Sequence, residues 1–457
     1  MIRSGAILQS PEVFLITAER SGGGISIEAG GGINTLGQGA VAFDSLDGYV
    51  YRTNEMDVLA VSNGWLDMQA PAAPTTAPVG KIDIGACTLS IDCIRSAELY
   101  SEGTIAIATN KQIELAESAR YGTRNLSLAV GGVNIGTQEV LAAAQLRGVL
   151  PTGLTLNQDV LNRLLQGDQQ YGAPALESLI LTARNGLNFF ETATLSTLGA
   201  DGVSSLQNLV LNTPAIFGYG AADDVALIQT GNLIWNGTDV APPAPLVTGP
   251  GTGSGIFKVQ ADTIEFGYAD RTQPDPLVEH DRLMLGFAQV DLTARERVTS
   301  NHTGSLSVYQ SRDEHVVGEG FAYQGGNLSI HSPLISSEAA AILAITAGGD
   351  VVLDGGLTGA QRPGSDVLGG TLAITGRNLF VDTAMVLPSG SLSLTAQDDL
   401  QLGDLAYLDV SGRTVPMFDQ TQYSWGGEVS LDSLGVALFS RQAQRLTSRL
   451  RIMLQAA

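Results

Sequence analysis

Leu343-Ala-Ile345 is followed by the spacer Thr346-Ala-Gly-Gly-Asp350 and by Val351-Val-Leu353, and this unit recurs along the chain. Each half places apolar residues two positions apart, which predicts a short strand with one buried face. Gly, Asp and Thr in the spacer favour a bend between the two strands. The unit returns as Leu372-Ala-Ile374 with Leu379-Phe-Val381, and as Leu392-Ser-Leu394 with Leu400-Gln-Leu402.

Earlier copies begin at Ile25, Ile105, Leu126, Leu179 and Phe257, with variable spacers. Strands this short become stable when each pairs with its equivalent in the next copy and the inward residues stack into one core. We therefore predict an all-β fold, a right-handed parallel β-helix. A β-sandwich is the alternative, but it would require two-residue Asn-Gly or Asp-Gly hairpin loops between longer strands.

The chain is strongly acidic, with 24 Lys+Arg against 46 Asp+Glu and a formal net charge of −22. We expect no nucleic-acid partner, because such binding depends on phosphate neutralisation by Lys and Arg. Hydrophobic residues make up 44 %, which excludes a disordered chain. We also expect no transmembrane segment, since no stretch reaches about 18 uncharged apolar residues.

We expect β-helix coils in residues 1–136 and 168–440, with a small α-helical insert at 137–167 between them. Asn157 is the candidate N-cap of the second helix of this insert, and Gly167 is its C-terminal stop.

Two Pro/Gly-rich stretches, 71–78 and 241–255, are expected to be loops that leave the coils. Residues 441–457 are predicted to form a C-terminal helical tail or cap over the last coil. The first ten residues contain no apolar core of a secretory signal peptide. We therefore expect either a cytoplasmic protein or an internal piece of a longer one.

Several Gly-Gly-x-Leu-x-Ile units resemble the coils of the filamentous haemagglutinin-like exoproteins of two-partner secretion. These units are Gly325-Gly-Asn-Leu-Ser-Ile330, Gly369-Gly-Thr-Leu-Ala-Ile374 and Gly426-Gly-Glu-Val-Ser-Leu431. Leu408-Asp-Val-Ser-Gly412 and the stretch 150–181 are similar to the same group, and 150–181 is more specific than the Gly-Gly units, which any β-solenoid can contain.

The resemblance implies a carboxy-proximal shaft segment of a large bacterial protein that is secreted or exposed at the cell surface. Its export partner would be an outer-membrane two-partner-secretion transporter, and a host-cell or glycan receptor would be its binding partner. Members of the family carry an amino-terminal secretion domain with a signal peptide, and neither is recognisable here. The expected function is therefore structural and adhesive, with attachment or aggregation through the shaft and its loops, or that of a plain spacer.

A β-helical polysaccharide lyase or hydrolase is the enzymatic alternative. Asp354, Asp382 and Asp404 follow the second strand of three neighbouring units, so that they would form a column of carboxylates. Stacked acids raise one another's pKa and supply a proton donor or a metal site. Asp also favours turns, and no Arg or Lys joins at matching offsets. We therefore predict no catalytic residue and no enzymatic activity.

Metal and cofactor sites are not expected. The four His residues, His280, His302, His315 and His331, lack ligand-type spacings and lie in polar, loop-like sequence. A tandem Gly-Gly-x-Gly-x-Asp array, which would bind calcium, is absent from the sequence.

Cys87 and Cys93 lie six residues apart, a spacing that favours a local disulfide over two free thiols. The aromatic residues are expected to line the core. A carbohydrate-stacking strip on an outer face is the alternative for them. They are Trp65, Trp235 and Trp425, with Phe or Tyr at 217, 219, 266 and 268.

Overall fold

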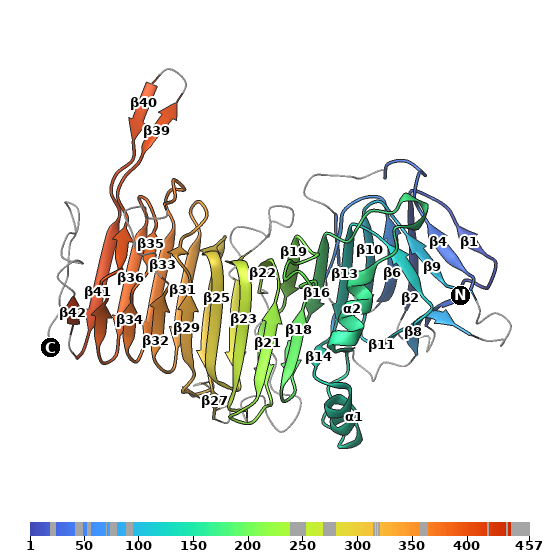
Figure 1. Ribbon diagram of the computed structural model, residues 1–457, viewed down its shortest axis with the longest axis horizontal. Coiled ribbons are helices and arrows are strands. Elements are labelled where there is room, and N and C mark those ends of the chain that lie inside the picture. Colours follow the sequence, from blue (N-terminus) through green and yellow to red (C-terminus); the bar gives the residue numbers. More distant parts are fainter. Residues whose placement is uncertain are drawn as a thin grey trace. The chain divides into compact units, whose positions relative to one another are not determined.

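The chain folds into strands that pair mostly in parallel, with two α-helices among the described residues (Figure 1). The computed structural model describes residues 1–18, 24–41, 49–52, 56–69, 71–73, 80–87, 95–237, 253–267, 280–313, 316, 318, 320–355, 364–417, 420–435 and 437–439. They form two compact units. The first comprises Met1–Asn188 and Leu195–Thr213, and the second comprises Phe189–Thr194 and the described parts of Pro214–Tyr268 and Pro274–Ala457.

The second unit is built from two long parallel ladders. One contains β20 (Ala215–Gly218), β24 (His280–Leu285), β26 (Thr303–Tyr309), β31 (Ile342–Ala347), β33 (Thr371–Gly376), β36 (Ser391–Ala396) and β41 (Glu428–Ser433). The other contains β21 (Val225–Gln229), β22 (Asn232–Trp235), β23 (Gly255–Phe266), β25 (Phe287–Ser300), β29 (Asn327–His331), β30 (Leu334–Ile335), β32 (Val351–Asp354), β34 (Leu379–Val381), β35 (Ala384–Val386), β37 (Leu400–Leu402), β38 (Tyr407–Asp409) and β42 (Ala437–Phe439).

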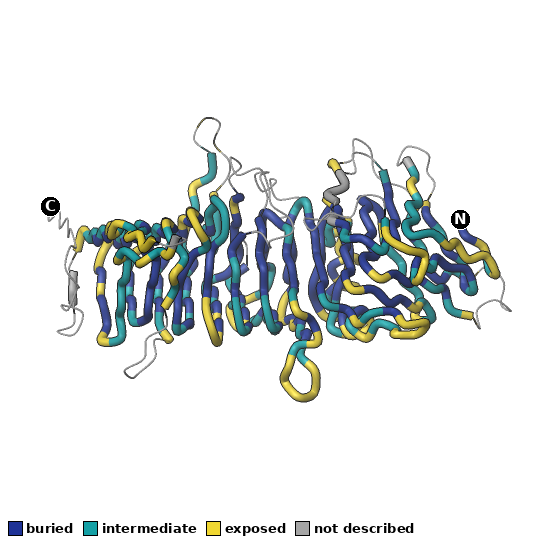
Figure 2. Tube along the Cα trace, turned by 90° about the horizontal axis from the view of Figure 1, so that it is seen from above, coloured by how far each residue is buried: buried dark blue, intermediate teal, exposed yellow. Residues whose placement is uncertain are grey.

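Equivalent residues of successive copies are register partners in this unit. Leu343 pairs with Leu372, and Leu372 with Leu392. The strands alternate buried with partly exposed residues, and the exposed residues gather at the bends (Figure 2). The predicted all-β class and the parallel pairing of successive copies are confirmed.

The glycine directly before β33, β36 and β41 is required for steric reasons. It is the second glycine of a Gly-Gly pair at Gly370 and Gly427, and it follows Ser389 at Gly390. A Cβ on Gly390 would lie 2.1 Å from the carbonyl oxygen of Gly370, and one on Gly427 would lie 1.8 Å from that of Gly390. These three glycines precede β33, β36 and β41, so that the backbones approach closely where each strand begins. A side chain at this position would force the strands apart.

A polar ladder lines the bend before β29, β32, β34 and β37. Asn327 Oδ1 accepts a hydrogen bond from Asp350 N at 2.9 Å, and Asn378 Oδ1 accepts one from Asp399 N at 3.1 Å. Between them, Asn378 Nδ2 donates to Asp350 Oδ1 at 2.8 Å. These bonds satisfy backbone groups that would otherwise lose partners at the bend, so the Asn and Asp residues of the spacers link one copy to the next.

The first unit contains a central sheet and smaller ladders. The central sheet contains β2 (Glu12–Ala18), β6 (Met56–Ser62), β10 (Thr104–Thr109), β13 (Asn125–Val130), β16 (Ser178–Ala183) and β19 (Asn208–Asn212). The smaller ladders are β1 (Ile7–Leu8), β4 (Gly32–Asn34), β9 (Glu98–Tyr100) and β12 (Arg120–Gly122); β3 (Ile25–Glu28), β8 (Lys81–Ala86) and β11 (Gln112–Leu115); β5 (Tyr49–Arg52) and β7 (Leu66–Gln69); and β14 (Val133–Ile135) and β15 (Leu154–Leu156). β17 (Leu187–Phe189) and β18 (Ala193–Ser196) span the division between the units.

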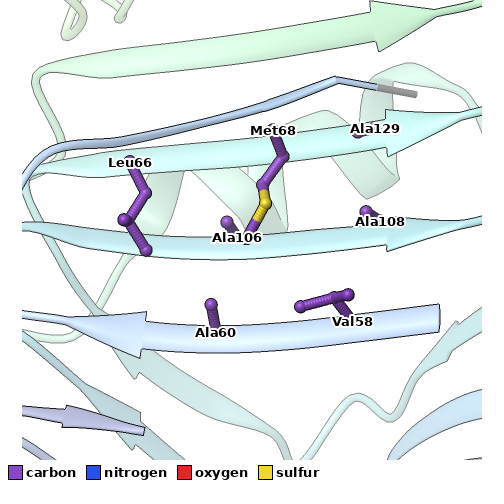
Figure 3. Close-up of a cluster of buried hydrophobic side chains, with 7 residues drawn as sticks. All are labelled: Val58, Ala60, Leu66, Met68, Ala106, Ala108 and Ala129. Atoms are coloured by element: carbon purple, nitrogen blue, oxygen red, sulfur yellow. The ribbon is translucent and has the colours of Figure 1, made fainter. Parts of the chain in front are cut away.

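One strand of the central sheet departs from the predicted coils. β6 runs antiparallel to both β2 and β10. Its residues are buried on both faces, so its sequence lacks the alternation that marks the repeated unit. Figure 3 shows the covering layer on one face, where Leu66 and Met68 of β7 pack with Val58, Ala60, Ala106, Ala108 and Ala129. The alanines leave room for this second layer.

The region of the predicted helical insert contains two helices, α1 (Gln138–Leu146) and α2 (Gln158–Gln166), followed by a 3₁₀ turn at Gln170–Gly172. Strand β15 lies between the helices and pairs in parallel with β14, so the insert is not helical throughout. Asn157 caps α2 as predicted, since its side chain accepts a hydrogen bond from Val160 N at 2.9 Å. Gly167 ends the helix with a φ of 51°. Leu161 and Leu164 are the buried residues of α2. Residues 441–457 and most of the loops at 71–78 and 241–255 lie outside the described residues.

A fully buried ion pair joins three strands of the central sheet. Lys111 Nζ lies 2.7 Å from Asp57 Oδ2, and both side chains are 0 % exposed. Asp57 also accepts hydrogen bonds from Thr109 Oγ1 at 2.6 Å and from Thr17 Oγ1 at 3.2 Å. Asp57 lies on β6, Thr109 on β10 and Thr17 on β2, so the carboxylate links the antiparallel strand to both neighbours.

Replacing Lys111 with Met is expected to destabilise the first unit by about 3–5 kcal/mol, because it leaves the Asp57 carboxylate buried without its counter-charge. The free energy of unfolding, measured by urea denaturation, checks this. Lys81→Met is the matched control, since Lys81 pairs with Asp83 at 2.8 Å on a side chain that is 41 % exposed. Its expected cost is under about 1 kcal/mol. Equal costs for the two variants would contradict the structural role of the buried pair.

Candidate functional site

The three aspartates of the predicted column do not all align. Leu353 of β32 and Val381 of β34 are register partners, and so are Val381 and Leu402 of β37. Asp354 and Asp382 therefore occupy equivalent positions, each one residue after this row. Gly403 takes that position on the next strand, and Asp404 lies one residue beyond it.

The reason for the offset lies in the contacts of Asp382. Its Oδ1 accepts a hydrogen bond from Leu405 N at 2.7 Å, so the carboxylate caps the following turn. The side chain occupies the space above Gly403, where a Cβ would lie 2.2 Å from Asp382 Oδ1. A second aspartate at this position would not fit.

On the neighbouring strand β29, the position equivalent to Asp354 is occupied by a histidine. His331 is the register partner of Asp354, and its Nδ1 lies 2.5 Å from Asp354 Oδ1. Both side chains are more than one-third exposed. The row therefore contains a surface His–Asp pair and a turn-capping Asp.

The four histidines are dispersed. His280 is buried at the start of β24. His302 lies in the turn before β26 with a φ of 60°, and burial lowers its pKa. His315 lies outside the described residues. Within the described ranges, no group of three or more His, Cys, Asp or Glu side chains is placed to hold a metal ion.

The predicted disulfide stays a prediction. Cys87 directly follows β8, and Cys93 lies outside the described residues.

Aromatic side chains of the second unit pack in its core. The rings of Phe189 and Phe257 lie 5.4 Å apart, and those of Phe257 and Phe287 lie 5.3 Å apart. Phe217, Trp235 and Phe266 are also buried, which confirms the core prediction for these residues.

The other aromatic residues predicted to line the core differ in how far they are buried. Tyr219 stacks on Phe190 at 4.8 Å, and burial raises its pKa to about 12. Trp65 is partly buried, and Tyr268 lies outside the described residues. Trp425, by contrast, is 85 % exposed.

Trp425 follows a β-hairpin that projects from the ladders of the second unit (Figure 1). The hairpin consists of β39 (Thr414–Met417) and β40 (Gln420–Tyr423), paired antiparallel. Tyr423 is 76 % exposed, so two large aromatic side chains lie close in sequence at its base. A shorter antiparallel pair, β27 (Ser311–Arg312) with β28 (Tyr323–Gln324), lies elsewhere in the unit.

Charged hydrogen bonds hold the base of the hairpin. Arg413 Nη2 donates to Asp409 Oδ2 at 2.9 Å, and Arg413 N donates to Ser424 Oγ at 2.7 Å. Ser424 Oγ also lies 2.7 Å from Ser389 Oγ, which joins the hairpin to the ladder. Burial acts to raise the pKa of Asp409, but the hydrogen bonds from Arg413 and Ser411 outweigh it, so its pKa lies below the ordinary value.

The hairpin is not among the elements that the sequence predicts. The stretch 408–412 resembles exoprotein coils, but it contains Asp409 and Ser411 of the hairpin base. A usable signal is the Asp-Val-Ser sequence itself, because Asp409 Oδ1 accepts a hydrogen bond from Ser411 N at 2.9 Å in a local turn.

No family model, curated protein or solved structure matches the chain. Among the described residues, no helix is long and apolar enough to cross a membrane. The structural class of the chain therefore rests on its own fold. It is a mostly parallel β protein with two helices among the described residues.

Asp409→Asn is expected to lower the stability of the second unit at pH 7 by about 1.5–3 kcal/mol, the usual contribution of a hydrogen bond to a charged group. A carboxylate with a lowered folded pKa contributes stability above its unfolded pKa of about 3.9 and loses it as the pH falls through the folded value. The difference between wild type and variant should therefore shrink below pH 4. Urea midpoints at pH 7, 5 and 3.5 test this, with Asp404→Asn, at an exposed turn residue, as control. A difference that does not vary with pH would contradict the assignment.

Proposed function

We propose that the copies close into one right-handed parallel β-helix, and that this β-helix serves as a structural and adhesive segment of a larger bacterial protein. Support comes from the constant parallel register of successive copies, in which the strands of one copy template those of the next. The Gly-Gly-x-Leu-x-Ile units add a resemblance to filamentous haemagglutinin-like exoproteins. That resemblance favours a secreted or surface-exposed location and export by an outer-membrane transporter of two-partner secretion.

The observation that carries the adhesive part is the anchored hairpin with its exposed aromatics. Single exposed apolar residues are normal on protein surfaces. Tyr423 and Trp425, however, are two residues apart and both more than three-quarters exposed, next to a base that is fixed by Arg413 and Ser424. Tyr and Trp supply much of the binding energy at protein interfaces, and a rigid support lowers the entropic cost of using them. The partner that we propose is a receptor on the surface of another cell, and this receptor is a protein or a glycan.

A double variant, Tyr423→Ser with Trp425→Ser, is expected to reduce binding of the purified chain to cells or to a glycan array by about tenfold or more, because it removes two interfacial aromatics. Retained circular dichroism should show that the fold is intact. Leu434→Ser is the matched control, since Leu434 is 73 % exposed in the same unit but lies outside the hairpin. Binding that survives the double variant would remove the hairpin from the adhesive role.

The enzymatic alternative has its own readout. Cleavage of an acidic polysaccharide that is lost on Asp382→Ala would favour the lyase or hydrolase over the adhesive segment. A chain without binding and without cleavage would be a plain spacer.

A further inference from the structure

The first unit contains a cavity of about 670 Å³, which is lined mainly by apolar residues and also by Lys81, Asp83 and Glu114. Its walls are inward residues of β10 and β13, including Ile105, Ile107, Leu126 and Leu128, and it is bounded by β8, β11, β15 and α2. This volume falls within the range of small-molecule sites, which are concave and mostly apolar with few polar groups.

The cavity arises where the repeat is interrupted. β11 is the edge strand of its ladder, which runs β11-β8-β3. Leu164 of α2 lines the cavity together with Leu115 of β11. A helix presents its side chains at a different spacing from a strand, so it covers this space without filling it.

Two arginines mark one end of the cavity. A second, more polar cavity of about 370 Å³ adjoins it, and Arg120 and Arg163 are the charged residues that line both. Each already has an acidic partner in a surface ion pair: Arg120 Nη1 lies 3.5 Å from Asp168 Oδ2, and Arg163 Nη1 lies 3.7 Å from Glu117 Oε1. Both guanidinium groups are about half exposed, and pairs of this kind contribute little. The arginines can therefore pair with an incoming anion at low cost.

The unpartnered hydroxyl of Tyr121 is a second, independent argument for a ligand. Tyr121 also lines both cavities and is 7 % exposed, and its hydroxyl has no hydrogen-bond partner among the described residues. Tyr100 nearby shows the usual arrangement, since its hydroxyl donates to Asp168 Oδ2 at 2.9 Å. Buried hydroxyl groups are normally satisfied. Burial raises the pKa of Tyr121, so the hydroxyl remains a donor at neutral pH.

We propose that this cavity binds a single-chain aliphatic carboxylate. Its alkyl chain would lie among the leucines and isoleucines of β10 and β13. Its carboxylate would accept a hydrogen bond from the Tyr121 hydroxyl and pair with Arg120 and Arg163. Arginine favours carboxylates because its planar group forms two parallel hydrogen bonds with them. This site is independent of the hairpin and of the adhesive function.

Calorimetric titration of the whole chain with decanoate, below its micellar concentration, tests the proposal. We expect saturable binding with one site, at least about tenfold tighter than for decanol or decyltrimethylammonium, because only the carboxylate gains charge-assisted hydrogen bonds. Acetate should not bind measurably, since it lacks the alkyl chain. Equal affinities for the three ten-carbon probes would overturn the assignment of the head group, and no saturable binding by decanoate up to about 1 mM would overturn the site.

Three variants locate the site. Arg163→Gln should weaken decanoate binding about tenfold, since one guanidinium is lost. Arg295→Gln, on a side chain 72 % exposed in the second unit, makes the same charge change elsewhere and should have no effect. Ile113→Trp should abolish binding by filling the cavity, and binding that survives it would place the ligand elsewhere.

Tyr121→Phe separates binding from folding. It should weaken decanoate binding several-fold while the thermal midpoint of the protein stays equal or rises, because the variant removes a buried hydroxyl that has no partner. An unchanged affinity would exclude the hydroxyl from the site. The hairpin variants Tyr423→Ser and Trp425→Ser should leave decanoate binding unchanged, so failure of either proposal is distinguishable from failure of the other.

Discussion

The fold depends on the alignment of equivalent residues in neighbouring parallel strands. In the second unit, Leu343, Leu372 and Leu392 are successive partners, and all three are buried. Because side chains alternate between faces, a slip of one residue would turn every apolar side chain of a strand outward. Hydrophobic burial therefore sets the register. The Asn378 and Asp350 side chains reinforce it at the bends, where the backbone leaves the ladder. The stacked glycines fix how closely successive strands begin.

This constraint also explains what could be predicted from sequence. Wherever one face is buried and the other is solvated, the alternation is visible, as in the Leu372-Ala-Ile374 copy. The insert at 137–167 was visible too, because a helix with a cap at Asn157 has a different apolar period and recognisable ends. Strand β6 was not predicted as antiparallel. It is buried on both faces, and a continuous apolar run carries no information about direction.

The candidate sites were less accessible to sequence reasoning because they depend on contacts between distant residues. Asp404 follows its strand at a spacing similar to that of Asp382, yet a glycine occupies the equivalent position. Lys111 follows Asn110 in what resembles a surface turn, but it is fully buried against Asp57 of another strand. Tyr121 and Arg163 lie far apart in sequence and line the same cavities. Such pairings follow from the fold and leave no local pattern.

A regular ladder leaves few groups for chemistry, because its backbone is paired with its neighbours and its inward residues are stacked. Function is then expected where the regularity ends. The hairpin β39–β40 interrupts the repeat between β38 and β41, and it exposes Tyr423 while the adjoining strand β41 buries Val429 and Leu431. Helix α2 interrupts the repeat in the first unit, and a cavity remains beside it. In both places the interruption has its own polar anchors, Arg413 with Asp409 in one and the Asn157 cap in the other. The interruptions are thus ordered parts of the fold, which is what a binding surface or a binding cavity requires.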